Sequence, residues 1–149
     1  MQKIPENNGV IILNIQNIEP MTGRLLKEDS STINLADILA TKVPQNVTFQ
    51  NGVTATGDGS IITVGGNKTL KVSIYGTATA RTVNFYAINA NSEKIALLGN
   101  NISTGNVASN TTGTSSETWK FDVTALNQIY VNISAISGGN LTITGTLVG

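Results

Sequence analysis

The stretch ETWKFDVTALNQIYVNISAISGGNLTITGTLVG, residues 117–149, contains the strongest structural signal in the chain. Over three successive segments, every second residue is apolar or small. These positions are Trp119, Phe121 and Val123, then Ile129, Val131 and Ile133, then Leu141, Ile143, Gly145 and Leu147. Because successive side chains of a β-strand point to opposite faces, the alternation predicts three strands, each with one face toward a core and the other toward water.

Further strands are expected upstream of this stretch, separated by turns rich in Gly and Asn. They cover residues 47–54 around a turn at Asn51-Gly52, then 60–64, 69–76, 81–88 and 93–98. Residues 100–116, NNISTGNVASNTTGTSS, are expected to form a long exposed loop, with at most a short strand at Ile102 or Val107. Short strands at close intervals, without a helical pattern between them, are typical of an antiparallel β-sandwich of the immunoglobulin-like or jelly-roll kind.

The segment before these strands has a different pattern. Residues 24–28 favour a short strand or an extended peptide. A helix of about two turns is expected next, capped by Ser31, Thr32 or Asn34 and closed by Lys42 and Pro44. Leu35, Ile38 and Leu39 would lie on one of its faces. The segment has too few apolar positions to fold alone, so it either completes the core or docks on another protein. The predicted organisation is an N-terminal arm over residues 1–46 and a mainly β domain over residues 47–149.

Composition excludes several classes of function. Nine basic residues balance nine acidic ones, so the chain lacks the basic surface that nucleic-acid binding requires. It contains no His and no Cys, which removes imidazole bases, thiolate nucleophiles and the usual zinc and copper ligands. Because the acids are scattered along the chain, we expect neither an enzyme nor a cofactor. Asp58 is alone in its Gly57-Asp58-Gly59 loop, so no calcium or other metal site is predicted.

The first twenty residues predict neither a signal peptide nor a membrane span. Their apolar run, Val10 to Leu13, is far too short to cross a bilayer, and no small-residue cleavage site follows a basic leader.

The tyrosines raise one binding hypothesis. Tyr75, Tyr86 and Tyr130 fall on the outward phase of their predicted strands, whereas Phe85, Trp119 and Phe121 fall on the inward phase. Three outward tyrosines could form a platform for sugar rings. The favoured interpretation is that they pack on a sheet face with their hydroxyls in water.

The C-terminal stretch also carries a family resemblance. Its elements Trp119-Lys120, Phe121-Asp122-Val123-Thr124-Ala125-Leu126, Tyr130 to Ile133 and Gly139 to Gly145 resemble a β module of small structural proteins in tailed bacteriophages. Residues 69–76 and 82–87 are similar to the strand pair of the same module. Residues 23–29 and 34–39 resemble the lead-in that such proteins place before it.

The resemblance implies a head decoration or head-fibre type protein. Its expected location is the capsid surface of a virion assembled in the host cytoplasm. Its expected partners are the major capsid protein or another virion protein, together with copies of itself, with trimers favoured. The residues implied in docking are Arg24, Leu25, Leu26, Lys27, Leu35, Ile38 and Leu39.

A rival interpretation is a glycan-binding or host-surface-binding module of a phage tail or baseplate. It would use Tyr75, Tyr86 and Tyr130. Sugar-binding members of the resembled group often carry a Trp-containing element after the second strand, whereas residues 89–93 here contain no Trp. A bacterial surface or spore-coat protein of the same fold is a third interpretation.

Overall fold

The computed structural model describes residues 24–26, 32–34 and 43–149. The chain divides into two compact units, Met1–Thr41 and Lys42–Gly149. In the first unit, strands β1 (Arg24–Leu26) and β2 (Thr32–Asn34) pair antiparallel, with Leu25 opposite Ile33. The short helix expected around Leu35, Ile38 and Leu39 falls on residues 35–42, outside the described residues.

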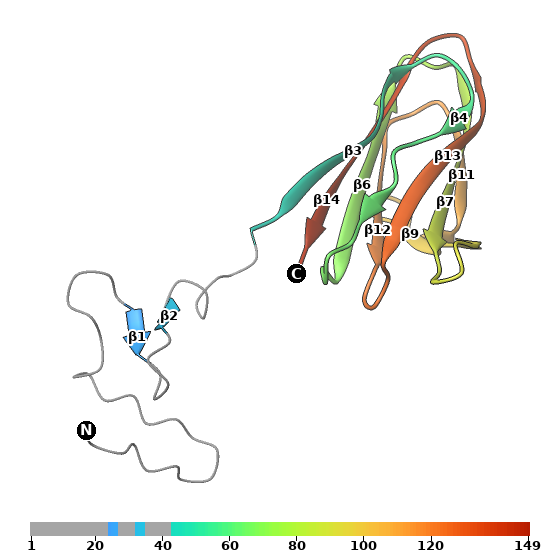
Figure 1. Ribbon diagram of the computed structural model, residues 1–149. Helices are drawn as coiled ribbons and strands as arrows, with labels where there is room; N and C mark the ends of the chain where they lie inside the picture. Colours follow the sequence, from blue (N-terminus) through green and yellow to red (C-terminus); the bar gives the residue numbers. More distant parts are fainter. Residues whose placement is uncertain (1–23, 27–31, 35–42) are drawn as a thin grey trace. The chain divides into compact units, whose positions relative to one another are not determined.

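The second unit is a sandwich of two antiparallel sheets, which Figure 1 shows as two layers of strands. The first sheet has the order β10-β9-β12-β6-β14-β3. Its strands are β3 (Gln45–Val53), β6 (Thr69–Gly76), β9 (Gly99–Asn101), β10 (Val107–Ala108), β12 (Glu117–Asp122) and β14 (Leu141–Val148). The second sheet has the order β11-β7-β13-β4, with β5 paired to β13 and β8 paired to β7. Its strands are β4 (Gly57–Asp58), β5 (Ile62–Thr63), β7 (Ala80–Ile88), β8 (Lys94–Ala96), β11 (Asn110–Gly113) and β13 (Gln128–Ser137). The predicted antiparallel β-sandwich is therefore confirmed.

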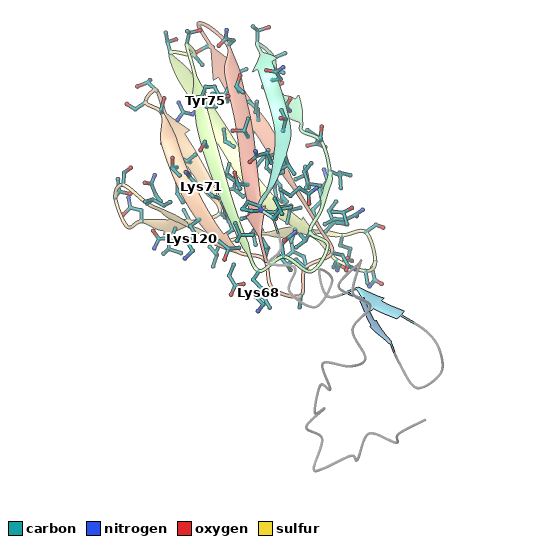
Figure 2. All side chains as sticks on the ribbon, turned by 90° about the vertical axis from the view of Figure 1, so that its left-hand side faces the viewer. Lys68, Lys71, Tyr75 and Lys120 are labelled. Atoms are coloured by element: carbon teal, nitrogen blue, oxygen red, sulfur yellow. The ribbon has the colours of Figure 1, made fainter. Side chains whose placement is uncertain are left out.

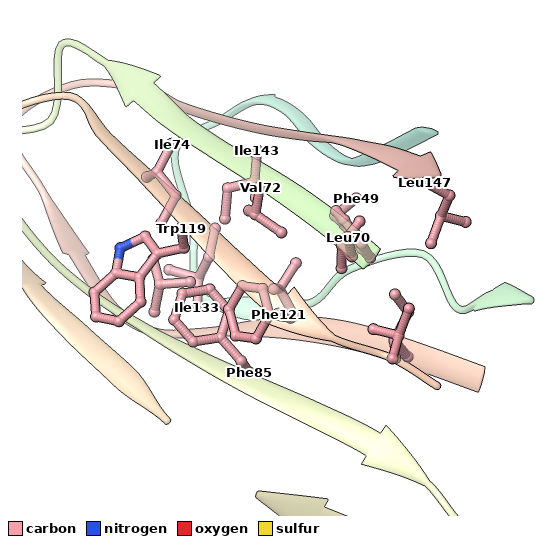
Figure 3. Packing of buried hydrophobic residues seen from close by; sticks show 14 of the residues in the cluster. Phe49, Leu70, Val72, Ile74, Phe85, Trp119, Phe121, Ile133, Ile143 and Leu147 are labelled. Atoms are coloured by element: carbon pink, nitrogen blue, oxygen red, sulfur yellow. The ribbon is translucent and has the colours of Figure 1, made fainter. Parts of the chain in front are cut away.

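The core between the sheets is built by the alternation seen in the sequence. The inward positions of β12, β13 and β14 are all buried, as are those of β6 and β7. At the centre, the Phe85 ring lies 4.7 Å from that of Phe121 and 5.4 Å from that of Trp119, measured between centroids. Figure 3 shows these rings among the surrounding aliphatic side chains. Because each strand buries only one of its faces, the outer faces of both sheets remain for other roles.

The Asn51-Gly52 pair does not form the expected turn. Strand β3 continues through it, and Gly52 adopts a φ of +62°. The register of β3 against β14 shifts between the pairs Ile143–Gln50 and Leu141–Val53. Glycine tolerates this left-handed backbone, so the pair makes a β-bulge inside one strand rather than a turn between two.

The prediction of a long loop over residues 100–116 is wrong in part, although the short strand expected at Val107 is confirmed as β10. This stretch contributes the end of β9, all of β10 and all of β11. Strand β10 pairs β9 over two residues, and β11 pairs β7 over four. Strand β11, which was not expected, is a short edge strand of polar residues and glycine, and it has no apolar alternation by which to recognise it.

A buried ion pair joins the two sheets close to this region. The Arg81 side chain, on β7, is 2% exposed, and that of Glu117, on β12, is 16% exposed, with Nη2 and Oε1 3.3 Å apart. Arg81 also donates to the carbonyl oxygens of Gly113 and Ser115. Thr111 Oγ1 and Trp119 Nε1 each donate to Glu117 Oε2 at 2.7 Å. Glu117 is thus a structural acceptor shared by three donors, and it holds the β11–β12 connection against β7.

Candidate functional site

The outer face of the second sheet carries the most organised group of surface side chains. On β7 and β13, Tyr86 lies opposite Tyr130 and Asn84 lies opposite Asn132. Their strand neighbours point the other way into the core. We call this surface the tyrosine face. It consists of Asn84, Tyr86, Tyr130, Asn132 and Ser134, together with Asp58 and Lys94.

The two tyrosine rings are stacked. Their centroids are 5.2 Å apart and their planes differ by 17°. Tyr130 is only 2% exposed although it lies outside the core cluster, whereas Tyr86 is half-buried. An aromatic pair in this arrangement gains from stacking as well as from burial. Tyr86 is the ring of the pair that remains partly open to solvent.

Lys94 covers Tyr130 from across the sheet. Strands β7 and β13 lie between β8, which carries Lys94, and β4, which carries Asp58. The Lys94 side chain crosses them, and its Nζ lies 4.8 Å from the Tyr130 ring centroid and 3.1 Å from Asp58 Oδ2. The two charged side chains are 55% and 52% exposed. The buried Tyr130 ring is therefore covered by an ion pair that is itself about half exposed.

A chain of amide hydrogen bonds continues from this ion pair along the strands. Asn132 Nδ2 donates to Asp58 Oδ1 at 2.8 Å. Asn84 Nδ2 donates to Asn132 Oδ1 at 3.2 Å and to Ser134 Oγ at 2.9 Å. The face therefore presents donors and acceptors in one connected network beside the stacked rings.

Asp58 is expected to titrate below the range of an ordinary aspartate. The hydrogen bonds from Asn132 and then from Lys94 favour the carboxylate and lower its pKa. Because the folded-state pKa is lowered, the stability that these contacts contribute is fully present above the unfolded-state pKa. It is lost as the pH falls through the folded-state pKa.

Replacing Asn132 by alanine should raise the Asp58 pKa toward its ordinary value, as measured by NMR titration of the carboxyl carbon. Asp122 is the matched control: Thr124 lowers its pKa, and that pKa should not respond to Asn132→Ala.

The outer face of the first sheet has a different character. Figure 2 shows Tyr75, Lys71, Lys120 and Lys68 following one another along it. Lys71 lies directly opposite Lys120 on the neighbouring strand, and Tyr75 is 45% exposed. Within residues 43–149, the ion pairs are Arg81–Glu117 and Lys94–Asp58, so neither of these facing lysines belongs to one.

The structure does not bring the three outward tyrosines together. Tyr75 belongs to the first sheet, whereas Tyr86 and Tyr130 belong to the second. Tyr130 also points outward as expected, yet it is covered. A platform of all three rings is therefore not formed, because the core of the sandwich separates them.

The expected docking residues are only partly described. Arg24, Leu25 and Leu26 form β1. The other four lie outside the described residues; they are Lys27, Leu35, Ile38 and Leu39.

Five members of the tyrosine face are not among the site residues expected from sequence: Asn84, Asn132, Ser134, Asp58 and Lys94. The period-two spacing of Asn84 with Tyr86, and of Tyr130 with Asn132, is the signal that points to the two asparagines. Nothing in the sequence links Lys94 to Asp58, which is 36 residues away.

Among the residues that the structure describes, no three acidic side chains gather as a metal-ligand cluster would. Nor does this part of the chain contain a helix with the length and apolarity to cross a membrane. The described fold and faces define an all-β sandwich module whose two outer faces differ in chemistry.

Comparison of the chain with known proteins identifies its family. The sequence profile of the XepA family matches residues 43–147, which is the sandwich. The chain belongs to the XepA family, and it is a phage-related protein.

Two relatives of Bacillus subtilis (strain 168) align over most of the chain. YqxG is 31% identical over 123 residues, 83% of this chain and 41% of YqxG. The SPbeta prophage-derived protein YomS is 34% identical over 101 residues, 68% of this chain and 84% of YomS. The chain thus spans less than half of YqxG and most of YomS.

Solved structures agree with the fold. The crystal structure of YomS superposes with a TM-score of 0.67 at 30% identity, covering 74% of this chain and 98% of YomS. That of the PBSX exported protein XepA gives a TM-score of 0.71 at 24% identity, covering 100% of this chain and 49% of the XepA chain.

Proposed function

We propose that the chain is a non-enzymatic structural protein of a tailed-phage virion. Its N-terminal arm, residues 1–46, attaches it to the capsid, and its sandwich is displayed outward. The observation that carries the proposal is the division of the chain into a self-contained sandwich and a separate N-terminal unit. A protein that decorates a particle needs one part that attaches and another that folds without the particle.

The chemistry of the sandwich supports a structural role. The carboxylate of Glu117, the least exposed acid of the sandwich, accepts hydrogen bonds from Arg81, Thr111 and Trp119. The remaining strand faces of the sandwich are rich in Thr, Asn and Ser, which keep a surface hydrated without a high net charge. Membership of a family with prophage-derived relatives fits the same role.

The proposed partner is the major capsid protein or another virion protein. The docking residues would be Arg24, Leu25, Leu26, Lys27, Leu35, Ile38 and Leu39. Attachment at a capsid symmetry axis would make the protein a homo-oligomer, with a trimer expected from the resemblance. Assembly would take place in the host cytoplasm. Measuring the mass of the purified protein in solution tests the oligomer separately from attachment.

Deletion of residues 1–44 tests the docking role. The cut falls just before β3, so every strand of the sandwich remains. We expect a soluble domain with the β circular dichroism of the full chain and loss of binding to phage particles that lack the protein, measured by co-sedimentation. Full-length protein with Tyr75→Ala is the matched control and should still bind.

Attachment retained by the deletion variant would contradict the docking role of residues 1–46. Particle imaging tests the location, because density on the tail instead of the head would contradict capsid decoration.

A further inference from the structure

The tyrosine face contains a buried polar group that lacks a partner. The Tyr130 hydroxyl is buried and, within residues 43–149, has no partner at hydrogen-bonding geometry. Buried hydroxyl groups in folded proteins are nearly always hydrogen-bonded. The Lys94 ammonium group approaches this hydroxyl closely enough for the contact to raise the pKa of the lysine, but without hydrogen-bond geometry. The Tyr130 hydroxyl therefore depends on one exposed side chain, which points to a better partner from outside the protein.

The group that covers this hydroxyl is weakly held. Lys94 and Asp58 are each about half exposed. The lysine is held over Tyr130 by its contacts with the ring and the hydroxyl of that tyrosine and by the one ion pair with Asp58. Water competes for exposed ion pairs, so they contribute little to stability. A ligand that takes the place of the Lys94 ammonium group loses little by displacing it.

The polar groups around the rings suit a polyhydroxylated ligand. Asn84 and Asn132 offer amide donors and acceptors, Ser134 offers a hydroxyl and Asp58 a carboxylate, all within one network. A sugar ring has an apolar face of C–H groups and a rim of hydroxyls. It can therefore pack on an aromatic ring and exchange hydrogen bonds with such a network at the same time.

The charges of the tyrosine face balance. Lys94 is paired with Asp58, and the other members of the face are uncharged at neutral pH. The face therefore has no net attraction for an anion or a cation, in contrast to the facing lysines Lys71 and Lys120 of the other sheet. This balance favours a neutral ligand.

We propose that the tyrosine face binds a neutral oligosaccharide. One pyranose unit packs on Tyr86, displaces Lys94 from Tyr130 and gives the Tyr130 hydroxyl its missing hydrogen bond. The neighbouring hydroxyls bind Asn84, Asn132 and Asp58. This function is additional to particle attachment and does not depend on it.

The test is titration of the ¹⁵N-labelled full-length protein with maltotetraose, cellotetraose and chitotetraose, followed by NMR. We expect saturable shifts with at least one of the three, centred on residues 84–86, 130–134, Asp58 and Lys94. Replacing Tyr86 by alanine should weaken binding about tenfold through loss of the stacking surface. The same change at Tyr75, on the other sheet, should leave affinity unchanged.

A second variant separates binding from folding. About half of the Lys94 side chain is exposed, so Lys94→Ala should keep the fold. It should strengthen binding by up to about fivefold, because the ligand no longer competes with the ion pair. Weaker binding by Lys94→Ala would overturn the displacement step. Absence of saturable shifts on the tyrosine face with all three tetrasaccharides would overturn the site itself, as would binding that survives Tyr86→Ala in a folded variant.

Discussion

Replacing Glu117 by alanine is expected to lower the free energy of unfolding by about 3–5 kcal/mol, because it leaves a buried guanidinium without its counter-charge. The Arg81 side chain is 2% exposed, so water cannot replace the lost carboxylate. The change also removes the acceptor of Thr111 and of the Trp119 indole. Urea unfolding followed by tryptophan fluorescence measures the effect, since Trp119 is the only tryptophan in the chain.

The matched control for Glu117 is Asp122, five residues further along the chain and exposed. Asp122→Ala should cost well under 1 kcal/mol beyond the loss of its contact with Thr124. Replacing both Arg81 and Glu117 by methionine should be less harmful than Glu117→Ala alone, because no unpaired charge stays buried. A loss below about 1 kcal/mol for Glu117→Ala would show that the pair is hydrated and not structural.

Phe121→Ala is expected to destabilise the sandwich by about 3–5 kcal/mol, the cost of removing a fully buried aromatic side chain from a packed core. The ring contacts Phe85 edge-on and lies at the centre of the cluster. It also lies over Gly99 on the neighbouring strand β9, where any added Cβ would overlap the ring. Gly99→Ala should therefore cost about 1–3 kcal/mol by overpacking.

The two changes should not add. Once Phe121 is alanine, the space above Gly99 is open, and Gly99→Ala should cost little or nothing further in the double variant. Gly105, which has open space around its Cα, is the control position: its cost as alanine should be unaffected by Phe121→Ala. Additive losses at Gly99 and Phe121 would contradict the proposed close packing.

The sandwich was predictable because its long strands repeat one simple rule. Strands β12 and β14 alternate over six and eight residues, and β13 alternates as far as the register shift after Ile133. This is enough for the inward and outward positions to be assigned correctly. Strands β10 and β11 have two and four residues, and their hydrogen bonds are set by neighbours in the sheet rather than by their own pattern. The sequence does not distinguish the bulge at Asn51-Gly52 from a turn, because glycine at positive φ is suited to both.

The exposure of residues on the outer faces was harder to predict, because it depends on side chains that reach over from other strands. Sequence phase placed Tyr130 on the outer face, which is correct, but its burial depends on Lys94 reaching over from another strand. In the same way, Glu117 looks like an isolated surface acid in the sequence. It is partly buried because β7 brings Arg81 beside it from 36 residues away. Contacts between distant residues carry both effects, and single-chain periodicity does not encode them.

The position of β14 has a consequence for how the protein is made. This strand, the last of the sandwich, lies between β6 and β3, and its partners on β3 are about a hundred positions earlier in the chain. During synthesis, the first sheet cannot be completed until residues 141–148 have left the ribosome. The two sheets therefore form together at the end and not one after the other during translation. Such long-range pairing folds slowly. Until then β3 and β6 present free hydrogen-bonding edges, and this interval is when nascent chains are most exposed to pairing with one another.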